Sequence, residues 1–145
     1  MTENISIVYH DKDMPHIEYV DGKSDWLDLR SVERYHLLRG EYKHISLGVS
    51  IKLPDNYEAY IIPRSSLFKN YGLMQANSFG LIDNSYCGNE DIWKFTAYAT
   101  METIINKYDR ICQFRIMIKQ PDINFVVVDK LDGDTRGGFG STGKK

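Results

Sequence analysis

Apolar and polar residues alternate along several short stretches of the chain, and this pattern predicts strands. In the clearest stretch, 45–53, every odd position is apolar and every even position is small or polar. This alternation is expected for a strand with one buried face. Residues 54–56, Pro-Asp-Asn, form a turn sequence, and 57–62 is the returning strand. The pattern therefore predicts a β-hairpin over 45–62.

Other short apolar stretches extend this interpretation to an all-β domain. We expect further strands at 5–9, 26–29, 79–82, 92–98, 111–118 and 124–128. The best helix candidate is a single turn over 65–69, with Ser65 as its cap. Many short strands separated by turns are typical of a sandwich or a barrel.

Composition and charge narrow the class of protein. The chain has 145 residues, of which 42% are hydrophobic and 26% are charged, and this balance fits one folded domain. Its formal net charge of −2 argues against a general nucleic-acid or anionic-membrane binder, because both need a basic surplus. The apolar runs are far shorter than the roughly 20 residues of a membrane span, and the chain begins without a secretory pattern. We therefore expect a cytoplasmic protein.

The cysteines and histidines do not form a metal-binding pattern. Cys87 and Cys112 are not part of a CxxC pair, and no HExxH spacing is present, so zinc is not expected. Two free thiols in a reducing compartment are favoured over a single disulfide.

Three polar clusters could carry chemistry, and each also has a plain structural explanation. Residues 63–67 place an arginine and two serines at a helix start, as in an anion site or a capped helix. Asp83 closes a short apolar strand, as a base or as a turn residue. In 109–113 an Asp-Arg pair precedes Gln113, as part of a site or as an ion pair at a strand edge.

The C-terminal end differs in composition from the rest. Residues 136–145 hold four of the 11 glycines, so we expect a single domain over 1–130 and a flexible arm over 131–145. The arm lacks the order of a Walker-type loop. Taken together, the side chains that suit a phosphate chain are Arg64, Ser65, Gln113, Arg136, Ser141 and Thr142. Asp83 suits an attacking water.

In this order the clusters resemble the motifs of the trimeric dUTP pyrophosphatases (dUTPases) over residues 24–143. Motifs two to five are similar to 63–67, 80–88, 109–113 and 136–143. The stretch 68–72 and motif three also resemble the bacteriophage or prophage branch. The resemblance implies an all-β jelly roll, a distorted β-barrel, in a homotrimer whose active sites are shared between subunits.

The resemblance also implies hydrolysis of dUTP to dUMP and pyrophosphate. Asp83 would activate a water for attack on the α-phosphorus, and Tyr86 would pack against the deoxyribose and exclude a 2′-hydroxyl. The backbone around Asn77, Gly80 and Ile82 would pair with the uracil edge. Residues on the phosphates would be Arg64, Ser65, Ser66 and Gln113. The arm would close over the ligand through Arg136, Phe139, Gly140, Ser141 and Thr142, with Phe139 on the uracil ring.

Mg²⁺ is the cofactor that the resemblance implies, held mainly by the triphosphate and water.

Three departures from the family motifs affect the assignment of site residues. Motif one is only loosely matched by 24–31, so Asp28 is the candidate contact to metal-bound water and Asp25 is its rival. Ser85 replaces an acidic residue before Tyr86. Tyr108 stands where motif four usually begins with glycine, which leaves the geometry of that turn open.

Two alternatives to dUTP hydrolysis stay open. dCTP deaminase shares the fold, but it needs a catalytic glutamate in the region of 86–90, where this chain has the dUTPase tyrosine. A protein of this fold could instead serve mainly to bind a regulatory protein partner, with catalysis secondary or lost. The intact catalytic positions argue against lost activity.

Overall fold

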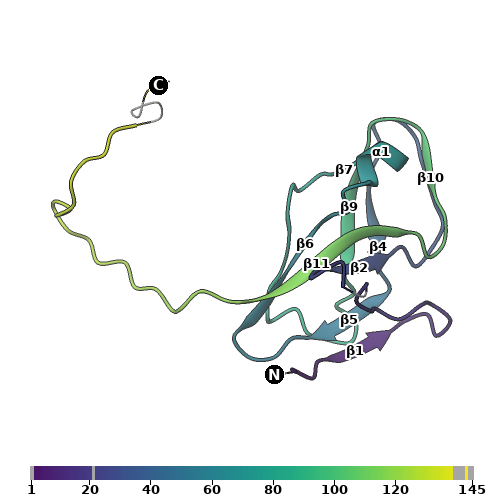
Figure 1. Cartoon of the computed structure of the whole chain (residues 1–145), viewed down its shortest axis with the longest axis horizontal. Helices are drawn as coiled ribbons and strands as arrows, with labels where there is room; N and C mark the ends of the chain where they lie inside the picture. Colours follow the sequence, from purple (N-terminus) through teal and green to yellow (C-terminus); the bar gives the residue numbers. More distant parts are fainter. Residues whose placement is uncertain (1, 21, 139–142, 144–145) are drawn as a thin grey trace.

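The structure is a computed structural model that describes residues 2–20, 22–138 and 143. In these residues the chain forms strands and one short helix (Figure 1). The strands are β1 (Ser6–Tyr9), β2 (Leu27–Arg30), β3 (Tyr35–Leu37), β4 (Tyr42–Ser46), β5 (Val49–Lys52), β6 (Tyr57–Pro63), β7 (Leu73–Gln75), β8 (Gly80–Ile82), β9 (Lys94–Ala99), β10 (Thr103–Ile105) and β11 (Arg110–Ile118), and the helix is α1 (Leu67–Tyr71). The expected all-β class is confirmed.

Two sheets position the candidate site. One has the strand order β2-β11-β6-β8 and the other the order β4-β9-β7, and all of these neighbours are antiparallel. Two further pairs, β1 with β5 and β3 with β10, extend the structure at opposite ends (Figure 1). The sheets do not close on one another, so the barrel is open and distorted.

The hydrophobic core lies between these sheets. Trp93 and Phe95 are fully buried, and the Trp93 ring packs edge-on against Phe114 of β11 with ring centroids 5.4 Å apart. Leu47 and Val49 bond to Trp93 through the backbone, at 2.9 and 2.8 Å. These bonds hold the junction of β4 and β5 against the start of β9. Burial of these large side chains is the main source of stability.

The prediction of one continuous strand over 45–53 is wrong. It is divided between β4 and β5, which pair with β9 and β1 respectively. Gly48 has φ +69°, a conformation that glycine adopts at little cost, and it lets the chain pass from one sheet to the other. The apolar positions on both sides still face one core, so the alternation continues across the break.

Three other predictions are also corrected. The hairpin over 45–62 does not form, because β6 pairs with β11 and β8 instead of β5. The helix begins at Leu67 with Ser66 as its N-cap, and the Ser66 side chain makes no capping bond, so Ser65 is not the cap. Residues 124–128 form no strand within this chain; they lie in the extended segment 119–138, which leaves the end of β11 (Figure 1).

Candidate active site

An arginine cluster forms where β2 and β11 meet the chain after β6. Asp28 of β2 lies opposite Gln113 of β11 in the sheet, and Arg64 follows the end of β6. Asp28 Oδ2 lies 3.4 Å from Arg64 Nε and 3.5 Å from Arg110 Nη1. The Arg64 backbone and guanidinium also donate to the carbonyls of Ile111 and Arg110. The sheet register thus brings together residues that are far apart in the sequence.

Two guanidinium groups in this cluster share one carboxylate. The side chains of Arg64 and Arg110 are 32% and 43% exposed, so the surplus positive charge faces solvent. The Gln113 amide donates to the Pro63 carbonyl at 3.1 Å, which fixes its side chain beside this group. Ser66 keeps its hydroxyl free of a capping bond, and Ser65 is exposed. Guanidinium, hydroxyl and amide groups in one place suit a phosphate chain.

The motif-four turn keeps the backbone geometry that glycine would give, although its first residue is tyrosine. Tyr108 has φ +72°, which is unusual for a bulky residue. Its N–H donates to the Ser31 carbonyl at 2.8 Å, and its carbonyl accepts from Arg30 at 3.0 Å. Its hydroxyl donates to Asp11 Oδ2 at 2.6 Å. These bonds hold the turn, and the hydrogen bond from Tyr108 is the main cause that lowers the pKa of Asp11.

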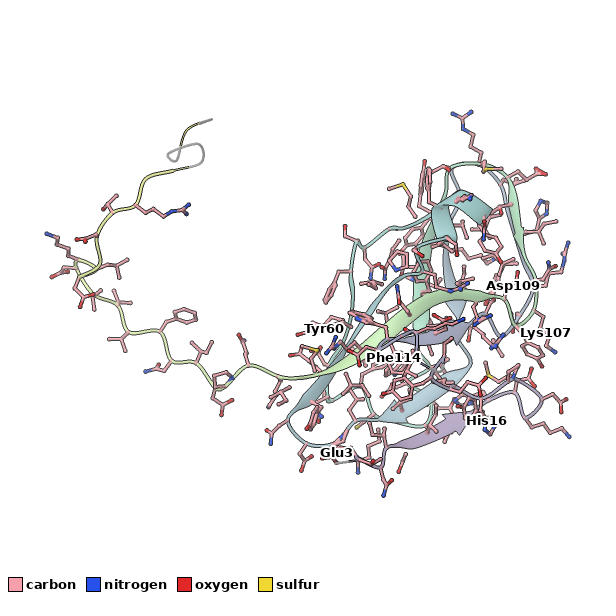
Figure 2. The ribbon with its side chains drawn as sticks, viewed as in Figure 1. Glu3, His16, Tyr60, Lys107, Asp109 and Phe114 are labelled. Carbon is pink, nitrogen blue, oxygen red and sulfur yellow. The ribbon has the colours of Figure 1, made fainter. Side chains whose placement is uncertain are left out.

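Asp109 connects this turn to the helix that follows Arg64. Its carboxylate accepts from the Tyr71 hydroxyl at 2.8 Å and from the Asn106 N–H at 2.9 Å. Burial, followed by the bond to Asp109, raises the pKa of Tyr71 to about 12. Figure 2 shows Asp109 and Lys107 at the end of the molecule where β11 begins. The Tyr71–Asp109 bond therefore ties α1 to the strand that carries Arg110.

A second group of predicted residues lies after β8. Asp83 is exposed, and its carbonyl accepts from the Tyr86 N–H at 3.0 Å. The Asn84 side chain donates to the Pro54 and Tyr57 carbonyls at 2.7 and 2.9 Å, which anchors the turn. The result is a fixed turn that presents the Asp83 carboxylate to solvent.

Asp83 and Tyr86 line one pocket of about 190 Å³ together with Ile82, Ile92 and Lys94. The Tyr86 hydroxyl donates to the Ile92 carbonyl at 3.0 Å, and burial, with a smaller effect of Asp91, raises the pKa of Tyr86. The Tyr86 phenol is therefore uncharged, and it forms one wall of the pocket. The sequence does not single out Lys94, because an exposed lysine at the start of a strand carries no motif.

The turn before β8 carries the predicted backbone contacts. Asn77 is exposed, Ser78 has φ +62°, and the Phe79 N–H donates to the Asn77 carbonyl at 2.6 Å. The Phe79 ring packs on Tyr60 with centroids 4.9 Å apart. Gly80 is buried opposite Ile61 of β6. The turn is thus an ordered, solvent-facing edge of backbone groups.

The structure does not bring the two groups together within one chain. Ile82 pairs with Ala59 near the start of β6, so Asp83 lies near Glu58, whereas Arg64 follows the other end of that strand. The six residue steps from Glu58 to Arg64 correspond to about 20 Å in an extended strand. A triphosphate chain is much shorter than this separation.

The remaining predicted residues lie elsewhere. Arg136 is exposed in the extended C-terminal segment. Phe139, Gly140, Ser141 and Thr142 lie outside the described residues. Asp25, the rival of Asp28, pairs with Arg115 at 2.8 Å. Cys87 is exposed, Cys112 is buried, and both are free thiols.

No helix in the described ranges is long and apolar enough to cross a membrane. No group of three or more His, Cys, Asp or Glu side chains gathers in this part of the chain.

Comparisons with known proteins agree with the motifs. A family model described as dUTPase matches residues 13–143. The SPbeta prophage-derived deoxyuridine 5′-triphosphate nucleotidohydrolase of Bacillus subtilis (strain 168) is 48% identical over 141 residues, which cover 97% of this chain and 99% of that protein. The deoxyuridine 5′-triphosphate nucleotidohydrolase of Escherichia phage T5 is 34% identical over 126 residues, 86% of this chain and 80% of the relative.

Solved structures show the same fold. A mutant dUTPase of Staphylococcus bacteriophage 80alpha with dUpNHpp superimposes with a TM-score of 0.80 at 19% identity, covering 99% of this chain and 100% of that one. A mutant dUTPase from phage phi11 of S. aureus gives 0.76 at 16% identity, covering 89% and 100%. The resemblance found in the motifs is confirmed, and the chain belongs to the dUTPase family.

Proposed function

We propose that this protein hydrolyses dUTP to dUMP and pyrophosphate. The observation that carries the proposal is that Asp83 and Tyr86 line the same pocket. A carboxylate at this position can orient and deprotonate a water for attack on the α-phosphorus. The tyrosine supplies a flat wall for a sugar and leaves little room for an additional hydroxyl. The names of the curated relatives give the same class of reaction.

The other residues of the site would bind and orient the nucleotide. The backbone from Asn77 to Ile82 would pair with the uracil edge, and such pairing discriminates strongly because a wrong base leaves buried polar groups unpaired. The phosphates would be held by Arg64, Ser65, Ser66 and Gln113. The C-terminal arm would then close over the ligand and exclude water, through Arg136, Phe139, Gly140, Ser141 and Thr142.

Magnesium would be held mainly by the nucleotide. The described residues offer no cluster of metal ligands, and the Asp28 carboxylate is already shared by two arginines. A triphosphate supplies the oxygen ligands that Mg²⁺ prefers, and bound Mg²⁺ would neutralise part of its charge. Asp28 stays the candidate for contact with metal-bound water. The phage phi11 relative coordinates a structural Mg(II) ion.

A homotrimer with shared active sites is the assembly that we propose. The separation of about 20 Å between the Asp83 and Arg64 groups supports this proposal, because a second copy could bring its own Arg64 group to Asp83. Apolar surface left open in one chain supports association. In segment 119–138, Phe125 and Val127 are 87% and 96% exposed, and the sheet face formed by Tyr42, Met74 and Tyr98 is also exposed.

We also propose that residues 1–130 act as one domain, with 131–145 as the closing arm; within one chain the compact part ends with β11 at Ile118. We further propose that the protein acts in the cytoplasm, where the exposed Cys87 thiol would stay reduced.

The test is release of pyrophosphate from dUTP, dCTP, dTTP and UTP with Mg²⁺. We expect release from dUTP alone. Deamination of dCTP would favour the deaminase alternative, although Glu90 does not line the Asp83 pocket. Binding of dUTP by the folded protein without hydrolysis would favour a regulatory binding protein.

A further inference from the structure

The turn at 76–79 joins the two main sheets of the protein. The strand before it, β7, pairs with β9 in the three-stranded sheet, while β8 after it pairs with β6 in the four-stranded sheet. The strands β7 and β8 are not paired with each other. The backbone holds each end of the turn to a different sheet, Ala76 to Thr96 of β9 and Gly80 to Ile61 of β6, and a side-chain contact at its base adds a direct link between the two sheets.

That contact is made by a buried amide. Gln75, the last residue of β7, is only 9% exposed, and its Nε2 donates to the Ile61 carbonyl of β6 at 3.1 Å. Its Oε1 is buried without a hydrogen-bond partner in the described part of the chain. The side chain thus links the two sheets directly beneath the turn.

Gly80 leaves the space that this amide occupies. A Cβ on Gly80 would lie 3.1 Å from Gln75 Nε2 and 3.2 Å from the Ile61 carbonyl oxygen. Gly80 also lies opposite Ile61 in the sheet register. The base of the turn is therefore closely packed, with direct contacts among Gln75, Ile61 and Gly80.

Stability alone does not explain a glutamine at this position. A buried acceptor without a partner is unfavourable, and an apolar side chain of similar shape is often neutral or better in such a place. The amide does, however, fix a distance between two sheets that an apolar side chain would leave adjustable.

We propose that Gln75 is a positioning residue that determines base specificity. It holds the backbone from Asn77 to Gly80 at a fixed distance from β6, so that the turn presents its donors and acceptors to one pyrimidine edge. This inference rests on the proposed function, in which that backbone reads uracil. Small displacements of polar partners are costly for selectivity, because recognition depends on complete pairing.

The test is Gln75→Met in the full chain, which keeps the length of the side chain but removes the amide. We expect a melting temperature within about 3 °C of wild type. The KM for dUTP should rise about tenfold while kcat changes about twofold or less. The inhibition constant of dUMP relative to that of dCMP should show a loss of base selectivity of about tenfold. Gly80→Ala, which pushes on the same amide, should cause the same loss of selectivity.

Leu73→Met is the matched control, because Leu73 is buried on the same face of β7. It should leave KM and selectivity unchanged. Unchanged KM and selectivity in Gln75→Met would overturn the inference, as would a parallel fall of melting temperature and kcat, which indicates a packing role. If the wild type binds but does not hydrolyse dUTP, the proposed function fails; the inference then still predicts about tenfold weaker binding of α,β-imido-dUTP by Gln75→Met.

Discussion

The shared carboxylate of Asp28 allows a sharp test of how the phosphate side of the site is built. Asp28→Asn keeps the shape of the side chain but removes the charge between Arg64 and Arg110. The two ion pairs have N–O distances of 3.4 and 3.5 Å, and the Asp28 side chain is 20% exposed. The change therefore leaves two guanidinium groups close together without a counter-charge.

The magnitude follows from these distances and exposures. Half-exposed ion pairs contribute up to about 1 kcal/mol each, so the loss of both should lower the free energy of unfolding by about 1–2 kcal/mol. For a chain of this length, that corresponds to a fall in melting temperature of about 3–6 °C. The two arginines should also lose their fixed orientation, so the KM for dUTP should rise about tenfold while kcat changes much less.

The assays are thermal unfolding and steady-state pyrophosphate release, each at low and high salt. The stability difference should shrink at about 1 M NaCl, because salt screens partly exposed charges. Asp25→Asn is the matched control, since the Asp25–Arg115 pair is largely exposed and its loss should have little effect. An unchanged melting temperature and KM in Asp28→Asn would show that Asp28 does not hold the two arginines in place. Recovery of its KM when the Mg²⁺ concentration is raised would show that Asp28 acts through metal-bound water and not through the arginines.

Other contacts give further predictions. Tyr108→Phe should have a lower melting temperature than Tyr108→Gly. Both replacements lose the bond to Asp11, but only phenylalanine keeps the unfavourable φ of +72°, which glycine relieves; equal melting temperatures would contradict this. The folded pKa of Tyr71 is raised to about 12, so the stability that its protonated phenol contributes should be lost between pH 10 and 12; urea unfolding of wild type and Tyr71→Phe across this range measures it. If the proposed trimer forms, Val127→Asp should shift the protein toward monomer in sedimentation velocity, because Val127 is 96% exposed in one chain; an assembly of the same size as that of wild type would exclude this segment from the interface.

The alternation of apolar residues predicted most strands of the fold correctly. β2, β8, β9 and β11 each contain alternating or apolar runs, because one or both faces of these strands are buried. The same alternation failed at Gly48, because it reports which face is buried and not which strand is the partner. Strand pairing here is between distant segments, such as β1 with β5, and local pattern does not encode it.

The motifs predicted the family of the protein, but they did not predict the geometry of the candidate site. The residue types and the order of the motifs that contain Arg64, Asp83 and Gln113 were sufficient to identify the dUTPase family. The approach of Asp28 to two arginines depends on the register of β2 and β11. The left-handed backbone conformation of Tyr108 depends on hydrogen bonds to residues far away in the sequence. Gln75 carries no pattern at all, since its importance comes from burial between two sheets. Within one chain the Asp83 and Arg64 groups stay apart, and in the proposed assembly other copies of the chain would complete the site.

The dUTPase activity and the role of Asp83 are tested together by pyrophosphate release from dUTP by the wild type and by Asp83→Asn with Mg²⁺, and with UTP, dCTP and dTTP as alternative substrates. We expect release from dUTP alone, and a loss of at least about a hundredfold in kcat for a correctly folded Asp83→Asn protein. Undiminished turnover by Asp83→Asn would contradict the role of Asp83, and absence of turnover by the folded wild type would contradict the enzymatic function itself.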